Sequence, residues 1–284
     1  NTKIPPFPLC PLCSLWFKWL WRQFVSETLI RYQRSAAPKA RKSEQQLRQE
    51  IVQVCQMLWQ RQYVAANDGN VSVRLGPDRF LCTPSGYSKG LIQPDELIIV
   101  DSNVDVVGPS YGPKRYLRPT SEMLLHLEAY RQRPDVEAVV HAHPPIAIAL
   151  SIAGISLAHC LIPDVVLGLG LIPTSDYATP ASREGAEVIR ELIKRYDAIV
   201  LQRHGSVTVG GSVLEAYLRL EKLEQAAQIT KTVYELRRPE PLPQGEVDKL
   251  VAWREQQGLL RPGQYEDICV VCGVNHQAAD CGCD

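Results

Sequence analysis

The sequence predicts one mixed α/β domain between residues 43 and about 260. Two long segments carry apolar residues at the spacing of an amphipathic helix, and the runs between them alternate or end in turn residues, as strands do. No internal repeat and no inner linker interrupts this region. Helices and strands interleaved in this way are typical of helices packed on a sheet.

The N-terminal part of the domain predicts one helix and three strands. The helix runs from Ser43 to about Gln62, because apolar residues from Leu47 to Leu58 recur on one helical face. "NVSVRL" predicts a strand by its alternation. "RFLCTPSG" predicts a short strand that runs into a turn, and "ELIIVD" predicts a further strand.

The rest of the domain continues the alternation of helices and strands. "RPTSEMLLHLEAYRQRP" predicts a helix that begins near Thr120 and stops before Pro134. "VEAVVHAH" and "AIVLQRHG" predict strands that end in histidine, with a helix at about 181–195 between them. Ser212 and Glu215 form a capping box for the longest helix, and a short amphipathic helix follows at about 246–257.

Composition and charge exclude several classes of protein. Lys and Arg total 31, as do Asp and Glu, so no overall field attracts nucleic acid, and no nucleic-acid partner is expected. The most apolar run, at 7–25, is interrupted by Lys18 and Arg22, and it lacks the features of a signal peptide. Residues 1–42 are predicted to be a poorly ordered extension without membrane contact, and the location is predicted to be cytoplasmic.

Two histidines in "VVHAHPP" are candidates for metal ligands. His141 and His143 lie two apart on a predicted strand, so their side chains share one face and could hold one cation. Many such pairs only pack, so the pattern leaves both interpretations open. His204, at the end of another predicted strand and followed by glycine, is the best candidate for a third ligand. His126 fits a core or capping role better.

Polar turns surround these histidines in the sequence. "DGNVS" and "TPSG" are strand-edge turns rich in backbone donors and hydroxyls, and "PTSE" opens a helix whose free N–H groups attract anions. They are either ordinary turns or the walls of a phosphate pocket. Glu122 either interacts with the helix dipole or serves as a carboxylate that binds the metal or moves a proton.

Five motifs together resemble the class II aldolase/adducin family: "DGNVS", "TPSG", "RPTSEMLLHLEAYRQRPDVEAVVHAHPP", "YATP" and "RHGSVTVG". Their order and spacing match over about residues 44–236. The resemblance implies a three-layer α/β/α domain with a central mixed sheet, assembled as a homotetramer with one Zn²⁺ in each interface active site. Among the activities of the family, L-fuculose-1-phosphate aldolase is the most similar type, with ribulose-phosphate 4-epimerase and methylthioribulose-phosphate dehydratase as alternatives.

The same resemblance assigns roles to residues of this chain. It implies that His141, His143 and His204 bind the metal, and that Glu122 alternates between metal ligand and acid/base on a zinc-stabilised enediolate. It also implies a set of residues that hold the phosphorylated substrate: Gly69, Asn70, Ser85, Gly86, Thr120 and Ser121. A non-catalytic interaction module like the adducin head domain is the alternative of a different class, and the intact histidines favour the enzyme.

The sequence departs from the aldolase pattern at one position. The aldolases use a tyrosine from a neighbouring subunit to protonate the aldehyde oxygen, and Cys160 occupies the matching position in this chain. His159, Asp164 or Tyr177 could replace that tyrosine. The departure leaves aldol cleavage, epimerisation and dehydration as open alternatives.

The C-terminal tail, residues 261–284, lies outside the resemblance and is rich in cysteine. Its order of cysteine and histidine approaches that of a zinc knuckle, and soft thiolates suit Zn²⁺. The candidate ligands of a second, structural Zn²⁺ are Cys269, Cys272, His276, Cys281 and Cys283. The alternative is a tail without metal that carries redox-sensitive thiols.

Overall fold

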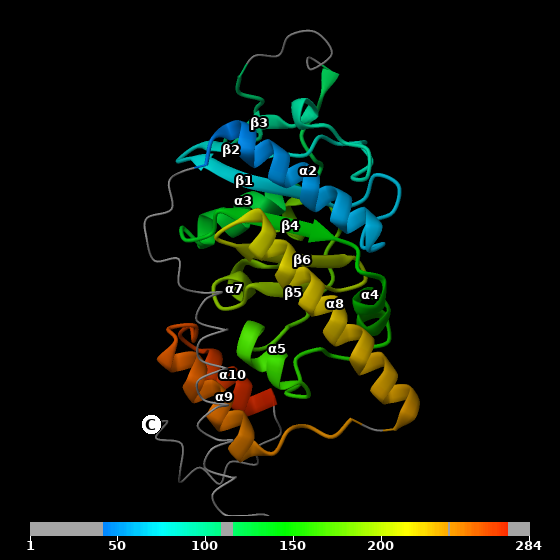
Figure 1. Cartoon of the computed structure of the whole chain (residues 1–284), viewed down its shortest axis with the longest axis vertical. Coiled ribbons are helices and arrows are strands. Elements are labelled where there is room, and N and C mark those ends of the chain that lie inside the picture. Colours follow the sequence, from blue (N-terminus) through cyan, green and yellow to red (C-terminus); the bar gives the residue numbers. More distant parts are fainter. Residues whose placement is uncertain (1–41, 109–115, 238, 272–284) are drawn as a thin grey trace, which may run out of the picture. The chain divides into compact units, whose positions relative to one another are not determined.

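The computed structural model describes residues 42–108, 116–237 and 239–271, which form helices and one sheet (Figure 1). The chain divides into two units after Ser43, and the sheet belongs to the second unit. The extension predicted over residues 1–42 lies outside the described residues except for Lys42. In the described part of the chain, no helix is both long and apolar enough to cross a membrane.

Six strands form the sheet in the order β3-β2-β1-β4-β6-β5. Their bounds are β1 Asn70–Gly76, β2 Arg79–Cys82, β3 Ile98–Val100, β4 Ala138–Ala142, β5 Ala198–Leu201 and β6 Gly205–Gly210. All neighbouring strands pair antiparallel, and parallel pairing among the described residues is confined to the bridge between Thr174 and Val200. The sheet is therefore less mixed than expected, because a tight turn rather than a crossover helix joins β5 to β6.

Helices cover both faces of this sheet (Figure 1). On one face α2 (Glu44–Gln60) and α8 (Val213–Leu236) share a core with Val140 of β4. The core of the other face contains Val139, because successive side chains of a strand point to opposite faces. The helices with residues in that second core include α3 Met123–Gln132, α7 Arg190–Ile193, α9 Gln244–Gln256 and α10 Gln264–Val271, and α6 Arg183–Glu187 packs on α3. The predicted three-layer α/β/α fold is confirmed.

Two further helices, α4 (Pro145–Ile152) and α5 (Pro163–Leu169), have no counterpart in the sequence prediction. They pack with α8 in a third apolar cluster. The backbone N–H groups of Ile146 and Ala147 each donate to the carboxylate of Glu224 at 2.9 Å, so α8 caps α4. A local pattern does not reveal this cap, because its partner lies far along the chain.

The other differences concern the ends of elements. α3 begins at Met123 instead of near Thr120, because the N–H of Met123 closes a turn onto the Thr120 carbonyl at 3.2 Å. A short 3-10 helix, η1 (Pro94–Glu96), occupies the start of the predicted "ELIIVD" strand. Within the segment predicted as the tail, α10 is helical and buries Ile268.

Candidate metal centre and active site

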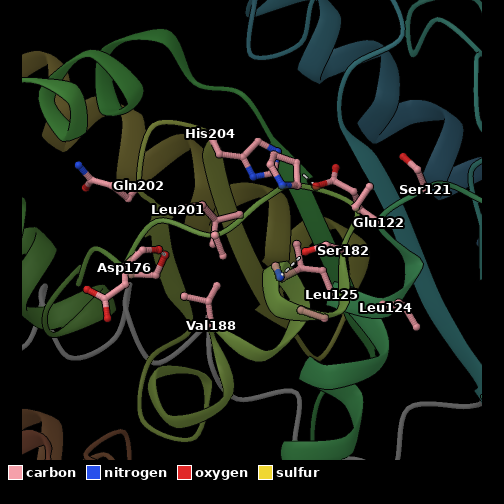
Figure 2. Close-up of a pocket in the computed structure, with 16 residues that line it drawn as sticks. Ser121, Glu122, Leu124, Leu125, Asp176, Ser182, Val188, Leu201, Gln202 and His204 are labelled. Carbon is pink, nitrogen blue, oxygen red and sulfur yellow. Dashed lines mark hydrogen bonds and ion pairs between the residues drawn. The ribbon is translucent and has the colours of Figure 1, made fainter.

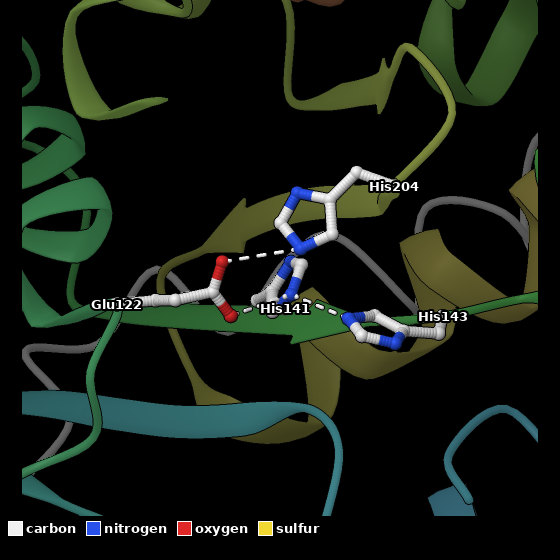
Figure 3. Close-up of side chains that lie close together, drawn as sticks. All are labelled: Glu122, His141, His143 and His204. Carbon is white, nitrogen blue, oxygen red and sulfur yellow. Dashed lines mark hydrogen bonds and ion pairs between the residues drawn. The ribbon is translucent and has the colours of Figure 1, made fainter. Parts of the chain in front are cut away.

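His141 lies in β4 at the centre of the sheet and is fully buried. Its Nδ1 lies 2.9 Å from the carbonyl oxygen of Ser206 on β6. A carbonyl only accepts hydrogen bonds, so Nδ1 carries the proton and donates it. The lone pair of Nε2 therefore points away from the sheet hydrogen bonds, toward the two other histidines (Figure 3). This tautomer is the one that a metal ligand at Nε2 requires.

His143 follows β4 and points to the same side of the sheet. Its Nε2 lies 3.0 Å from Nε2 of His141, and its Nδ1 lies 3.4 Å from a carboxylate oxygen of Asp68. Burial, followed by the nearby rings of His141 and His204, lowers the pKa of His143 to about 4. The imidazole is therefore neutral near pH 7, as a metal ligand must be. Asp68, the first residue of the "DGNVS" motif, is a partner for its outer nitrogen that was not predicted from the sequence.

Glu122 and His204 complete the cluster. Nε2 of His204 lies 3.2 Å from Oε1 of Glu122, and Oε2 of Glu122 lies 2.9 Å from Nε2 of His141 (Figure 3). Burial alone would raise the pKa of Glu122, but the adjacent His141 and His204 outweigh it and hold that pKa well below its ordinary value. The group therefore presents a carboxylate to the imidazoles.

The donor atoms of this cluster suit a divalent cation. One ligand atom from each of Glu122, His141, His143 and His204 lies within 4.8 Å of the others. In a tetrahedral site with bonds of about 2.0–2.1 Å, neighbouring ligand atoms are about 3.3 Å apart. The separations given above, from 2.9 to 3.2 Å, are close to that spacing. Three neutral imidazoles and one carboxylate are a donor set that such cations bind.

Gly205 allows the strands to approach closely beside this cluster. A Cβ atom at position 205 would lie 2.4 Å from the Ala142 carbonyl oxygen and 2.9 Å from Cδ2 of His143. We expect Gly205→Ala to lower the free energy of unfolding by about 1–3 kcal/mol, because backbone must move to relieve the overlap. We also expect weaker metal binding, measured by competition with a chelator. Gly245→Ala, in helix α9 where the Cβ meets nothing within 4 Å, is the matched control: it should not lower stability and should leave metal binding unchanged.

The predicted phosphate-binding turns gather beside the cluster. Ser85 and Gly86 lie next to the "PTSE" segment, because the Ser85 N–H donates to the Arg118 carbonyl at 2.8 Å and Pro84 bridges to Pro119. Thr120 and Ser121 directly precede Glu122, and Gly69 lies against β4 in the left-handed conformation with φ 71°. The side-chain amide of Asn70 lies 3.2 Å from Glu122. Segments far apart in the sequence thus meet at one end of the sheet.

A pocket is lined by Glu122, His204 and the predicted substrate residue Ser121 (Figure 2). Its polar lining includes Asp176, Ser182 and Gln202. None of these three residues was predicted from the sequence, although "YATP" lies among them and is part of the family pattern. The Ser182 hydroxyl caps α6, since it accepts from the Gly185 N–H at 2.9 Å and donates to the Thr179 carbonyl at 2.6 Å. The Gln202 amide donates to the Ser151 carbonyl at 2.7 Å.

The four residues considered for the second proton donor lie outside this pocket. Cys160 is fully buried in the core beneath α9 and α10, and it is disulfide-bonded, so it has no thiol proton to give. Tyr177 is 59% exposed, and His159 and Asp164 do not line the pocket. Cys160 therefore does not supply the proton, whereas His159, Asp164 and Tyr177 would act, like the aldolase tyrosine, in the site of a neighbouring subunit and remain predictions.

The predicted second metal site lies outside what the structure describes. Its candidate ligands are the side chains of Cys269, Cys272, His276, Cys281 and Cys283. It remains a prediction from the sequence.

His126 is buried in the core, which is one of the two roles predicted for it from the sequence. Its burial should make the stability of the protein sensitive to acid. Burial, followed by the charge of His141, lowers the pKa of His126 from 6.5 to about 3. Between these values the unfolded chain binds a proton that the folded chain refuses, so stability is complete above pH 6.5 and is lost as the pH falls. We expect His126 to contribute up to about 1.4 kcal/mol per pH unit in this window.

Denaturation of wild type and His126→Gln at several pH values between 7 and 4 measures this contribution. The difference in unfolding free energy between the two proteins should narrow as the pH falls, because titrating groups that they share cancel. A difference that stays constant would contradict a buried neutral His126.

A comparison with known families identifies the chain. The family described as Class II Aldolase and Adducin N-terminal domain matches residues 49–230. The chain belongs to the class II aldolase/adducin family. This result confirms the resemblance drawn from the five motifs. Class II aldolases use a divalent metal, and the Glu122 and histidine cluster fits such an ion.

Curated relatives of known description cover most of the domain. L-fuculose phosphate aldolase of Methanococcus maripaludis is 34% identical over 180 residues, which are 63% of this chain and 93% of the relative. The 3-oxo-tetronate 4-phosphate decarboxylase of Escherichia coli is 33% identical over 192 residues, which are 66% of this chain and 87% of the relative. Membership and these relatives support an enzyme of the lyase or decarboxylase type that acts on a small phosphorylated sugar.

Solved structures agree with the fold. L-fuculose-1-phosphate aldolase of Thermus thermophilus is 29% identical, with a TM-score of 0.56, and covers 68% of this chain and 98% of its own. YgbL of Klebsiella pneumoniae, for which aldolase, epimerase and decarboxylase are the candidate activities, is 31% identical with a TM-score of 0.66. That match covers 74% of this chain and 100% of YgbL.

Proposed function

We propose that this protein is a zinc-dependent lyase that breaks or forms a C–C bond next to the ketone of a phosphorylated ketose, as an L-fuculose-1-phosphate aldolase does. The observation that carries the proposal is the position of the Glu122 carboxylate between His141 and His204. A carboxylate so placed can exchange a proton with a carbon whose neighbouring oxygens are held by the metal. Three imidazole nitrogens and one carboxylate oxygen are a donor set that favours Zn²⁺.

Different residues would bind the metal, transfer the proton and hold the phosphate. His141, His143 and His204 would hold the ion, which supplies Lewis acidity for the negative charge that develops on the substrate oxygens. Glu122 would return a proton to the enediolate carbon after the C–C bond breaks. The phosphate would be bound by a set of turn residues with backbone and side-chain donors: Gly69, Asn70, Ser85, Gly86, Thr120 and Ser121.

Decarboxylation is a second candidate, and Cys160 favours it. Aldol cleavage needs proton transfer at the aldehyde oxygen, whereas loss of CO₂ does not. The position matched to the aldolase proton donor is a buried, disulfide-bonded cysteine in this chain. Loss of CO₂ from a 3-oxo-tetronate 4-phosphate and cleavage of a ketose 1-phosphate both leave the enediolate of dihydroxyacetone phosphate. One metal site therefore suits both reactions, and epimerisation or dehydration would reuse the same proton chemistry.

One experiment tests the enediolate step that the candidate reactions share, and it does not require the second product to be known. The zinc-loaded protein is incubated with dihydroxyacetone phosphate in D₂O, and exchange of the hydroxymethyl proton is followed by NMR. We expect exchange that requires both metal and Glu122. If the protein shows no exchange and binds no metal, a non-catalytic adducin-like module is supported instead.

A substrate panel then separates the activities. Phosphorylated ketoses and 3-oxo-tetronate 4-phosphate are scored for release of dihydroxyacetone phosphate, release of CO₂, loss of water or formation of an isomer. We further propose a homotetramer with sites at subunit interfaces, whose oligomeric state sedimentation measures. The catalytic domain would span the predicted residues 43–260 together with α10, which packs on its core.

A further inference from the structure

A chain of hydrogen bonds leads from Glu122 into the interior of the protein. The Asn70 amide nitrogen lies 3.2 Å from Oε2 of Glu122, and the Asn70 oxygen lies 2.5 Å from Nε2 of His126. On the far side of the imidazole, Nδ1 lies 2.6 Å from the Ser72 hydroxyl. That hydroxyl lies 2.8 Å from the hydroxyl of Tyr130. The proposed function uses neither His126, Ser72 nor Tyr130.

The chain is built by two elements that meet face to face. Asn70 and Ser72 are two residues apart on β1 and so share a face of the strand. His126 and Tyr130 are one turn apart on α3, the helix that Glu122 precedes. Asn70, Ser72, His126 and Tyr130 are each at most 4% exposed. The chain is therefore sealed from solvent except at Glu122.

The chemistry of each group sets the direction of every hydrogen bond. The Glu122 carboxylate only accepts, so the Asn70 NH₂ faces it and the Asn70 carbonyl oxygen faces His126. The opposite orientation of the amide would set its oxygen against the carboxylate. Nε2 of His126 must then carry the proton, and its Nδ1 must accept.

The remaining bonds follow from the imidazole. Burial keeps His126 neutral near pH 7, with its pKa lowered to about 3, so only one of its nitrogens carries a proton. The Ser72 hydroxyl therefore donates to Nδ1, and the Tyr130 hydroxyl donates to Ser72. Every donor along the chain points toward Glu122.

We propose that His126, supported by Ser72 and Tyr130, is a positioning residue for the Glu122 carboxylate. Its Nε2–H fixes the Asn70 amide, which in turn holds Oε2 of Glu122 on the side away from His204. Glu122 is thereby restrained from both sides, by the histidine cluster and by Asn70. The inference rests on the proposed role of Glu122 as ligand and acid/base. A polar core that serves only folding is the competing interpretation.

The test compares His126→Leu with His126→Gln in the full-length protein. Leucine removes both hydrogen bonds, whereas the glutamine amide retains an N–H that can reach the Asn70 oxygen. Loss of an orienting partner behind a metal ligand costs about 10- to 100-fold in activity or metal affinity. We expect His126→Leu to slow proton exchange of dihydroxyacetone phosphate by about that factor with little change in KM, and His126→Gln to recover most of the rate.

A second readout is independent of turnover. The visible absorption of the Co²⁺-substituted protein reports the ligands around the ion, so it should change in His126→Leu and revert in His126→Gln. Thr230→Val changes a buried residue on α8, away from these hydrogen bonds. This control should lose stability without changing the exchange rate or the Co²⁺ spectrum. If wild type exchanges no proton, the proposed function fails, while the Co²⁺ spectra still decide the positioning role.

Several outcomes would overturn the inference. One is that His126→Leu exchanges the proton at the wild-type rate and has the wild-type Co²⁺ spectrum. The other is that His126→Gln is as impaired as His126→Leu. If the leucine variant does not fold, Ser72→Ala and Tyr130→Phe decide instead. We expect their effect on the Co²⁺ spectrum to diminish with distance from Glu122, so that Ser72→Ala exceeds Tyr130→Phe. Equal or reversed effects would indicate a role in folding only.

Discussion

The double replacement His141→Ala/His143→Ala is expected to abolish divalent-metal binding at this site. Wild type should carry about one Zn²⁺ per chain, because the cluster offers three imidazoles and a carboxylate. With two imidazoles removed, His204 and Glu122 alone make too few bonds to retain the ion. Elemental analysis after dialysis measures the loss, and the increase in Tm that added metal gives wild type should vanish in the variant.

His159→Ala is the matched control for this experiment. His159 is a partly buried histidine outside the cluster, so its replacement should leave metal content unchanged. Circular dichroism should show that the double variant retains its helices and sheet. A folded double variant that carries as much metal as wild type would contradict the assignment of these ligands.

Glu122→Gln is expected to lower kcat by about 10²- to 10⁴-fold while metal content stays near that of wild type. The amide oxygen still accepts a hydrogen bond from Asn70, and three imidazoles remain for the ion. The neutral amide, however, neither takes nor returns a proton, so the acid/base contribution is lost. Proton exchange of dihydroxyacetone phosphate in D₂O, measured together with metal stoichiometry, separates these two effects.

Glu235→Gln controls for the loss of one carboxylate. Glu235 lies at the exposed end of α8 and pairs with Lys231, so its replacement should leave both readouts unchanged. Exchange in Glu122→Gln at the wild-type rate would show that another group moves the proton. Loss of the metal together with the rate would make Glu122 chiefly a ligand.

The parts of the fold that follow from periodicity were predictable. α2 and α8 follow from apolar stripes, and β1 and β4 from alternation or apolar runs. The helices α4 and α10 were missed, because their stability depends on contacts made far along the chain. Glu224 caps α4 from α8, and Ile268 anchors α10 in the core. Local propensity does not contain such partners.

The candidate site was likewise predictable only in part. The types and order of His141, His143, His204 and Glu122 indicated a metal before any geometry was known, since few other residue types bind such an ion at this spacing. The sequence suggested substrate contact for Asn70, but it did not show that the Asn70 amide lies against Glu122. That contact depends on the register of β1 against α3.

The sequence by itself thus determined the family, the three-layer fold class and the candidate ligand types, because all three depend on residue identity and short-range spacing. Only the tertiary structure decided which way the Asn70 amide faces, that His126 is a neutral donor behind it, and that Cys160 is buried away from the pocket. The physical reason is that hydrogen-bond direction and burial are set by groups brought together across the sheet.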